Sequence, residues 1–145
     1  MSFHTWHTYG YGVEMTNISC DSVDRIKLLL SVAPEFQKQV DEQFEERGIK
    51  EPTVEDYLEF DQDCNLGLAY ILQQVILETE DIEFTACTDF EDRIYLLYEP
   101  SYPWDMPDKD KSLKERDIVG ILVKYLTFLT SENIPVDYHS PENGG

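Results

Sequence analysis

Three histidines provide the residue type in this sequence that is best suited to metal binding. His4 and His7 stand three residues apart near the N-terminus, and His139 lies far along the chain. Neutral imidazole is a good zinc ligand, so the three side chains could hold an ion if the terminal strands were adjacent. On a strand, however, positions 4 and 7 point to opposite faces, which disfavours a shared ion. We predict no metal and no cofactor, and we keep a small metal-dependent hydrolase that uses histidine and carboxylate residues as an alternative function.

Two aspartates in segment 61–67 are spaced as at the start of a calcium-binding loop. Asp61 and Asp63 stand at alternate positions of this segment, which ends in a glycine. A functional loop of this kind needs glycine at its sixth position and a bidentate glutamate at its twelfth. Those two positions hold Leu66 and Leu72. We instead expect the aspartates to precede a buried helix and to offset the positive end of its dipole.

The cysteines and the N-terminal sequence favour a cytoplasmic protein. Cys20, Cys64 and Cys87 are widely separated and have no C-x-x-C spacing, which disfavours a disulfide framework or a zinc knuckle. Their acidic surroundings disfavour the thiolate form that nucleophilic catalysis requires. Residues 1–6 lack the basic start and apolar run of a signal peptide, and Lys124 interrupts the longest apolar helical stretch. We therefore expect neither export nor a membrane span.

Charge is the dominant chemical feature of the chain. Its 145 residues include 30 Asp and Glu against 11 Lys and Arg, which gives a formal net charge of -19. Because 41% of the residues are hydrophobic, the chain can bury a core and carry this charge on a folded surface. Such a surface repels phosphate backbones and anionic lipids, so we expect no direct binding to nucleic acid or membrane. With 30 acidic residues, adjacent carboxylates arise by chance, and we predict no enzymatic activity.

Most of the negative charge falls in two segments. Residues 35–63 carry 11 acids and three bases, a net -8, and residues 78–92 carry seven acids and no base, a net -7. Within the predicted helices, like charges stand four residues apart at positions 41 and 45, 42 and 46, and 55 and 59. Each such pair costs about 0.2–0.5 kcal/mol in an isolated helix. Local helix stability therefore does not explain why these acids are there.

If the two segments share a surface, their carboxylates could enter a groove lined by Lys and Arg in place of the phosphates of a nucleic acid. The predicted partner-binding residues are Asp41, Glu42, Glu45, Glu46, Glu55, Glu59, Asp61, Asp63, Glu80, Asp81, Asp89, Glu91 and Asp92. Two other interpretations stay open. The acids could form a solvated face that confers solubility or salt tolerance, or the chain could be a regulatory interaction domain whose partner contacts exposed aromatics such as Tyr102 and Trp104.

The elements that must position these side chains follow from apolar spacing and turn residues. The expected elements are, in order, a strand over 5–15, a helix from 21 or 22 to 33, a second from Pro34 to Gly48, a short helix after Thr53, a buried helix around 68–76, strands over 82–87 and 93–98, a helix capped by Ser112 that runs to Leu129, and a strand over 135–139. Gly10 and Gly12 predict a bulge or a close backbone approach in the first strand.

Three further local signals refine this outline. Thr53 followed by Asp56 predicts a helix cap, with Val54, Tyr57 and Leu58 turned inward. The prolines between positions 100 and 107 predict an ordered but irregular connection, and the polar residues after position 139 need an anchor to be ordered. The element order predicts a single domain over 1–145 of the α+β class, with helices packed on one face of a small antiparallel or mixed sheet.

Three stretches carry a resemblance to known proteins: Thr8-Tyr9-Gly10-Tyr11-Gly12, residues 98–104 (YEPSYPW) and residues 136–145 (VDYHSPENGG). With them the chain resembles small uncharacterised acidic proteins of Gram-positive bacteria and their mobile elements, a resemblance that implies no activity. Its size and acidity are also similar to those of phage anti-CRISPR proteins. That second resemblance implies a basic protein surface as partner, that of an RNA-guided nuclease, and an acidic inhibitor that acts there as a nucleic-acid mimic.

Overall fold

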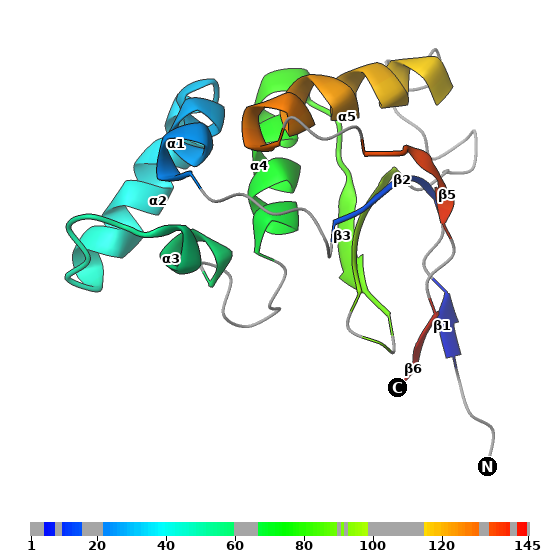
Figure 1. Cartoon of the computed structure of the whole chain (residues 1–145), viewed down its shortest axis with the longest axis horizontal. Helices are drawn as coiled ribbons and strands as arrows, with labels where there is room; N and C mark the ends of the chain where they lie inside the picture. Colours follow the sequence, from blue (N-terminus) through cyan, green and yellow to red (C-terminus); the bar gives the residue numbers. More distant parts are fainter. Residues whose placement is uncertain are drawn as a thin grey trace.

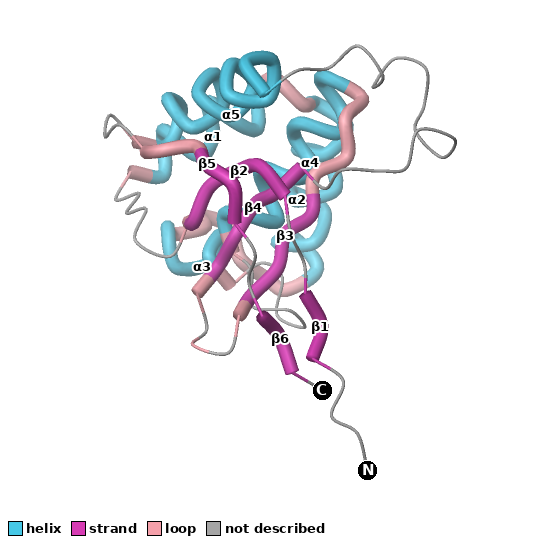
Figure 2. Tube along the Cα trace, turned by 90° about the vertical axis from the view of Figure 1, so that its right-hand side faces the viewer, coloured by secondary structure: helices cyan, strands magenta, loops and turns pink. Residues whose placement is uncertain are grey.

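An antiparallel sheet with helices packed against it forms the frame of the molecule, which confirms the predicted α+β class (Figure 1). The computed structural model describes residues 5–7, 10–15, 22–59, 67–89, 91, 93–98, 115–130, 134–139 and 142–144. Figure 2, in which the sheet faces the viewer, shows the described helices gathered behind it. The predicted proline-rich connection, with Tyr102 and Trp104, and the predicted cap at Ser112 lie outside the described residues.

The described helices follow the predicted order. They are α1 (Val23–Ser31), α2 (Pro34–Glu46), α3 (Val54–Leu58), α4 (Leu68–Glu80) and α5 (Glu115–Leu129). As predicted, Pro34 is the first residue of its helix, where its fixed φ suits the helix and its missing N–H is not needed. Along α2, the side chains buried against the core recur every four residues, at Phe36, Val40 and Phe44. The opposite face of α2 is thereby left to solvent.

The strands form two separate sheets. They are β1 (Thr5–His7), β2 (Gly10–Glu14), β3 (Thr85–Thr88), β4 (Ile94–Tyr98), β5 (Asp137–His139) and β6 (Glu142–Gly144). The larger sheet has the order β3-β4-β2-β5 with antiparallel neighbours, and β1 pairs with β6. The strand predicted over 5–15 is described as β1 and β2, with residues 8 and 9 between them outside the described residues. Both pieces pair with the C-terminal stretch in one register, from Thr5 opposite Gly144 to Gly12 opposite Asp137. The β1–β6 pairing also gives the polar C-terminal residues the anchor that they need.

The predicted hairpin is confirmed with a shorter first strand. β3 and β4 pair antiparallel, from Thr85 opposite Leu97 to Thr88 opposite Ile94. Ile82 and Phe84 were expected in the strand and are buried, but they precede it. The side-chain amide of Gln73 in α4 donates to the Phe84 carbonyl at 2.8 Å. The Phe84 carbonyl thus accepts its hydrogen bond from the Gln73 side chain and not from the backbone of a neighbouring strand.

Burial in the core centres on α4. Its buried residues are Leu68, Ala69, Ile71, Leu72, Val75 and Ile76. The helix contacts α2, α5 and both strands of the hairpin. This agrees with the prediction of a central buried helix, since few polar residues are left on its circumference.

The short α3 begins with the predicted cap. The Thr53 hydroxyl accepts from the Asp56 backbone N–H at 3.3 Å, and the Asp56 carboxylate accepts from the Thr53 N–H at 2.8 Å. Tyr57 is buried and Val54 is half-buried, as expected. The prediction that Leu58 turns inward is wrong, because the helix ends there and leaves that side chain 39% exposed.

Gly12 of β2 makes the close backbone approach that the sequence predicts. A Cβ atom at this position would collide with the Leu96 carbonyl oxygen of β4 and would lie 2.8 Å from the Leu97 Cα. These are backbone atoms of a paired strand, so they cannot move aside as a flexible side chain would. The β2–β4 pairing at the centre of the sheet therefore depends on glycine here.

We predict that Gly12→Ala lowers the free energy of unfolding by about 1–3 kcal/mol, because the added methyl group overpacks a fixed backbone contact. Gly120→Ala is the matched control. Gly120 is exposed in α5 and an added Cβ meets nothing within 4 Å, so this change should raise stability by about 0.5–1 kcal/mol. Urea denaturation of both variants measures the two effects, and an unchanged midpoint for Gly12→Ala contradicts the prediction.

Candidate acidic interface

The last two turns of α2 present four carboxylates to solvent. Asp41, Glu42, Glu45 and Glu46 are all exposed, while the inward side of the same turns buries Phe44. None of the four forms an ion pair or a side-chain hydrogen bond with the described residues. Because these four acids stand close together, this part of the helix carries a strong negative charge.

The position of these acids is unfavourable for the helix itself. The C-terminal end of a helix carries a partial negative charge and is stabilised by cations, but the last turn of α2 contains no basic residue. Like-charge pairs four residues apart add to this cost. Asp41, Glu42, Glu45 and Glu46 therefore lower the stability of the helix end that carries them, a cost that Arg47 at the C-cap offsets in part.

The other end of α2 is held by a carboxylate from a distant part of the chain. The first residues of α2 have no side-chain cap of their own. Glu78 of α4 accepts hydrogen bonds from the backbone N–H of Phe36 at 2.8 Å and from that of Glu35 at 3.2 Å. A carboxylate at this position satisfies free N–H groups and complements the positive helix end. Glu78 thus fixes α2 on α4.

Helix α3 brings two more exposed acids, Glu55 and Glu59, beside the end of α2 (Figure 1). The contact is made by two aromatic rings, since Tyr57 packs edge-on against Phe44 with centroids 5.2 Å apart. We call six exposed acids from the last two turns of α2, from α3 and from the residue that follows α3 the acidic helical surface; they are Asp41, Glu42, Glu45, Glu46, Glu55 and Glu59. The structure thus brings together these predicted partner-binding residues. The exposed cations Lys38, Arg47 and Lys50 lie in the same segment.

Glu80, at the end of α4, was predicted to face a partner but joins two helices instead. Its carboxylate accepts from the Tyr125 hydroxyl at 2.7 Å and from the Lys124 ammonium at 3.2 Å, both in α5. The hydrogen bond from Tyr125 and the contacts with Lys124 hold the pKa of Glu80 below its ordinary value, against the opposing effect of burial. Asp81, the next residue, is exposed at the end of α4 in a left-handed conformation.

Asp89 is a correction to the predicted interface, because it does not face solvent. The residue is only 7% exposed, at the turn between β3 and β4. Its carboxylate accepts from the Arg93 side chain at 2.7 Å, from the backbone N–H groups of Glu91 and Arg93 at 2.9 and 3.0 Å, and from the Tyr95 hydroxyl at 3.1 Å. Asp89 therefore organises the hairpin turn.

The same contacts set the pKa values of the turn. Burial by itself raises the pKa of Asp89, but the hydrogen bonds from Arg93, Glu91 and Tyr95 outweigh it and hold that pKa below its ordinary value. Burial, together with Asp89, raises the pKa of Tyr95 to about 12. Glu91 keeps an exposed carboxylate, 3.7 Å from the Arg93 guanidinium.

The two acidic segments lie on different parts of the fold. Helix α4 contacts α2 on one side and the β3–β4 hairpin on the other. In Figure 1, α2 and α3 lie on the left, and the turn that joins β3 to β4 lies at the lower end of the sheet. The acidic helical surface thus belongs to the first segment. The described acids of the second segment are divided: Glu78, Glu80 and Asp89 accept hydrogen bonds within the fold, and Asp81, Glu83 and Glu91 are exposed. Asp61, Asp63 and Asp92 lie outside the described residues.

The histidines give no metal site within the described part of the chain. No group of three or more His, Cys, Asp or Glu side chains there is arranged to hold an ion. His4 is outside the described residues, and of His7 the structure describes the backbone in β1. His139 lies in β5 with its ring 5.3 Å from that of Tyr95, and its buried Nε2 has no hydrogen-bond partner in the described part of the protein.

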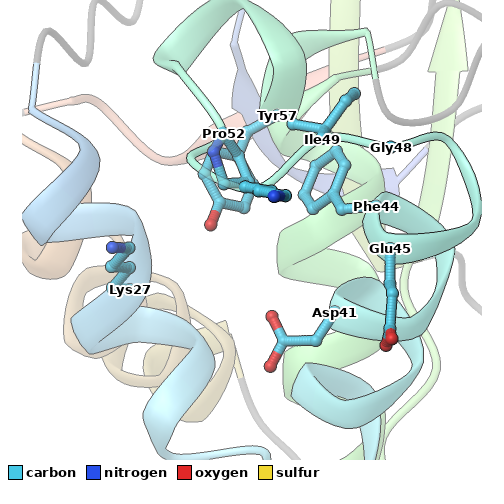
Figure 3. A pocket seen from close by; sticks show the side chains of 9 residues that line it. Lys27, Asp41, Phe44, Glu45, Gly48, Ile49, Pro52 and Tyr57 are labelled. Atoms are coloured by element: carbon cyan, nitrogen blue, oxygen red, sulfur yellow. The ribbon is translucent and has the colours of Figure 1, made fainter.

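A pocket of about 430 Å³ lies beside the acidic helical surface (Figure 3). It lies between α1, α2, the turn after α2 and α3, and is lined by Lys27, Asp41, Phe44, Glu45, Gly48, Ile49, Lys50, Pro52 and Tyr57. The sequence predicted that Phe44 and Tyr57 turn inward, but not that they border a hollow. The available signal was two inward aromatics flanking a turn that contains glycine and proline, at 48 and 52.

Comparison with known proteins returned no matching family model, no matching curated protein and no matching solved structure. Among the described residues, no helix combines the length and the apolar character needed to span a bilayer. Any functional conclusion therefore has to come from the chemistry of the acidic helical surface and the pocket beside it.

We predict that Asp89→Asn lowers the free energy of unfolding by about 1–3 kcal/mol at pH 7, because charge-assisted hydrogen bonds are lost from a buried group. The pKa of Asp89 is lower in the folded protein, so its contribution is complete above the unfolded value near 4 and is lost as the pH falls through the folded value. The difference between the two proteins should therefore shrink below about pH 4.

Denaturant unfolding across pH 3–8 measures this difference. Glu91→Gln is the matched control, because its carboxylate is exposed and makes only one long contact to Arg93. A constant gap between Asp89→Asn and the original protein over the whole pH range would contradict the assignment.

Proposed function

We propose that this protein is a non-enzymatic inhibitor whose acidic helical surface occupies a basic nucleic-acid groove of another protein. The observation that carries the proposal is the set of unpaired carboxylates in the last turns of α2, where they oppose the helix dipole and one another. Residues that cost stability without serving the core are expected where a partner uses them.

The electrostatics of association support this function. A protein with a net charge of -19 attracts basic surfaces over long distances, and complementary charge raises the rate of encounter at low salt. The negative charge of this protein also repels nucleic acid. The protein and the nucleic acid therefore compete for the same basic groove and do not bind each other. The carboxylates of the acidic helical surface are free to pair with Lys and Arg, because they have no pairing partner among the described residues.

An RNA-guided nuclease is the partner class that we propose, in the cytoplasm. Such enzymes hold a nucleic-acid duplex in a positively charged channel and recognise it through its backbone. A channel of this kind matches a rigid acidic surface better than a groove that reads bases through directional hydrogen bonds. The anchored position of α2 on α4, through Glu78, provides that rigidity.

Charge reversal on the acidic helical surface tests the proposal. We predict that Glu42→Lys with Glu46→Lys weakens binding to an RNA-guided nuclease tenfold or more, about 1.4 kcal/mol, because two attractive contacts become repulsive. Displacement of a labelled guide RNA from the purified nuclease, followed by fluorescence anisotropy at several salt concentrations, gives the measurement. Rising salt should weaken the inhibition by the unmodified protein.

Glu83→Lys with Glu91→Lys is the matched control. Both pairs of changes bring the net charge from -19 to -15, but Glu83 and Glu91 are exposed outside the acidic helical surface. The control pair should keep binding within about twofold, and the first pair should not lower stability, since lysine suits the C-terminal turn of α2. Equal losses for both pairs, or no displacement of nucleic acid by the unmodified protein, would reject the proposal.

A further inference from the structure

The pocket beside the acidic helical surface contains a polar group without a partner. Tyr57 is only 2% exposed, yet its hydroxyl forms no hydrogen bond with the described residues. Figure 3 shows this hydroxyl directed toward the space between Lys27 and Asp41. The hydroxyl oxygen opens into the hollow, so it is available to exchange a hydrogen bond with a polar ligand atom there.

The walls around the Tyr57 hydroxyl combine rings and carboxylates. The Phe44 and Tyr57 rings meet edge-on, and Pro52 adds apolar surface beside them. Asp41 and Glu45 contribute carboxylates from successive turns of α2. Aromatic surface next to carboxylate oxygens is the environment that a guanidinium group prefers, because the rings stabilise its flat face and the carboxylates accept its N–H groups.

Two lysines also line the pocket, and they have to be weighed against a cationic ligand. Lys27 and Lys50 are exposed, so their flexible side chains can turn toward water when another cation enters. The Asp41 carboxylate lies close enough to Tyr57 to raise its pKa, after the larger effect of burial, and Asp56 adds to this. The charges that shift the pKa of this ring are therefore carboxylates.

We propose that this pocket accepts an arginine side chain of the basic partner. The guanidinium donates to the Asp41 carboxylate and to the Tyr57 hydroxyl oxygen, and the aliphatic part of the side chain packs on Phe44 and Pro52. Arginine fits better than lysine, because its planar head offers several N–H donors in fixed directions at once. The identity of the partner rests on the proposed function, whereas the chemistry of the pocket does not.

A free arginine derivative tests the pocket without any partner protein. N-acetyl-arginine methylamide, titrated into the labelled protein, should shift the NMR signals of Phe44, Gly48 and Tyr57 in a saturable way. The citrulline derivative has the same shape without the charge and should bind at least fivefold more weakly. The lysine derivative should also bind more weakly. Equal binding of the arginine and citrulline derivatives, or no saturable shift at these residues, overturns the proposal.

Two substitutions test separately the hydroxyl and the carboxylate that we propose bind the guanidinium group. Tyr57→Phe removes only the unpartnered hydroxyl and Asp41→Asn removes only a charge, and each should weaken binding of the arginine derivative at least threefold. Lys27→Ala is the control and should leave binding equal or stronger. Thermal unfolding of each variant shows whether the fold is retained. Full binding by both folded variants would overturn the assignment.

The same variants distinguish this inference from the proposed function. One outcome is that charge reversal at Glu42 and Glu46 abolishes nuclease binding while Tyr57→Phe and Asp41→Asn leave it unchanged. That result would support the proposed function and reject the arginine pocket. If the arginine derivative binds but no nuclease is inhibited, the pocket stands and the proposed function falls.

Discussion

The hydrogen bonds from the start of α2 to the Glu78 carboxylate are the interaction on which the display of charge depends. Helix α2 has acids at the end where its dipole favours cations, and it has no side-chain cap of its own at the other end. Its stability therefore comes from outside, through the buried side chains on its inner face and through Glu78 of α4. The buried and nearly apolar helix α4 thus stabilises the strongly charged helix α2.

The same residue types serve two different purposes in this chain. Asp89 and Glu80 accept hydrogen bonds from groups that would otherwise be poorly satisfied, and their pKa values are lowered as a result. Asp41 and Glu42 satisfy nothing within the described protein. Charge alone does not separate these roles, since all four are acids in acidic segments. The number of donors around each carboxylate does separate them.

Local sequence patterns predicted the helices and strands well, but they did not predict which elements contact one another. The four-residue apolar repeat and Pro34 predicted α2, and the Thr53 cap predicted α3, because both depend on neighbours within one or two turns. The role of Glu78 was beyond such reasoning, because its hydrogen bonds join residues 42 and 43 positions apart. The pairing of the first predicted strand with the C-terminal stretch was equally out of reach, because it joins residues more than 120 positions apart.

The candidate site was predicted in part for a similar reason. The exposed acids of α2 follow directly from the helical period, because Val40 and Phe44 fix which side is inward. The burial of Asp89 could have been anticipated from Arg93 and Tyr95, which follow it across a tight turn. For the pocket, the two inward aromatics beside the turn were only a partial signal, because the hollow also needs α1 to lie beside α3, and no local pattern encodes that placement.

The pairing of β1 with β6 has a practical consequence for anyone who handles this protein. The first and last described strands lie together, and Figure 1 places β1 and β6 on the right, away from α2 and α3 on the left. A fluorescent reporter or an immobilisation tag joined to either end is therefore carried on the side remote from the carboxylates. The molecule can be tethered to a sensor with its charged helices pointing outward.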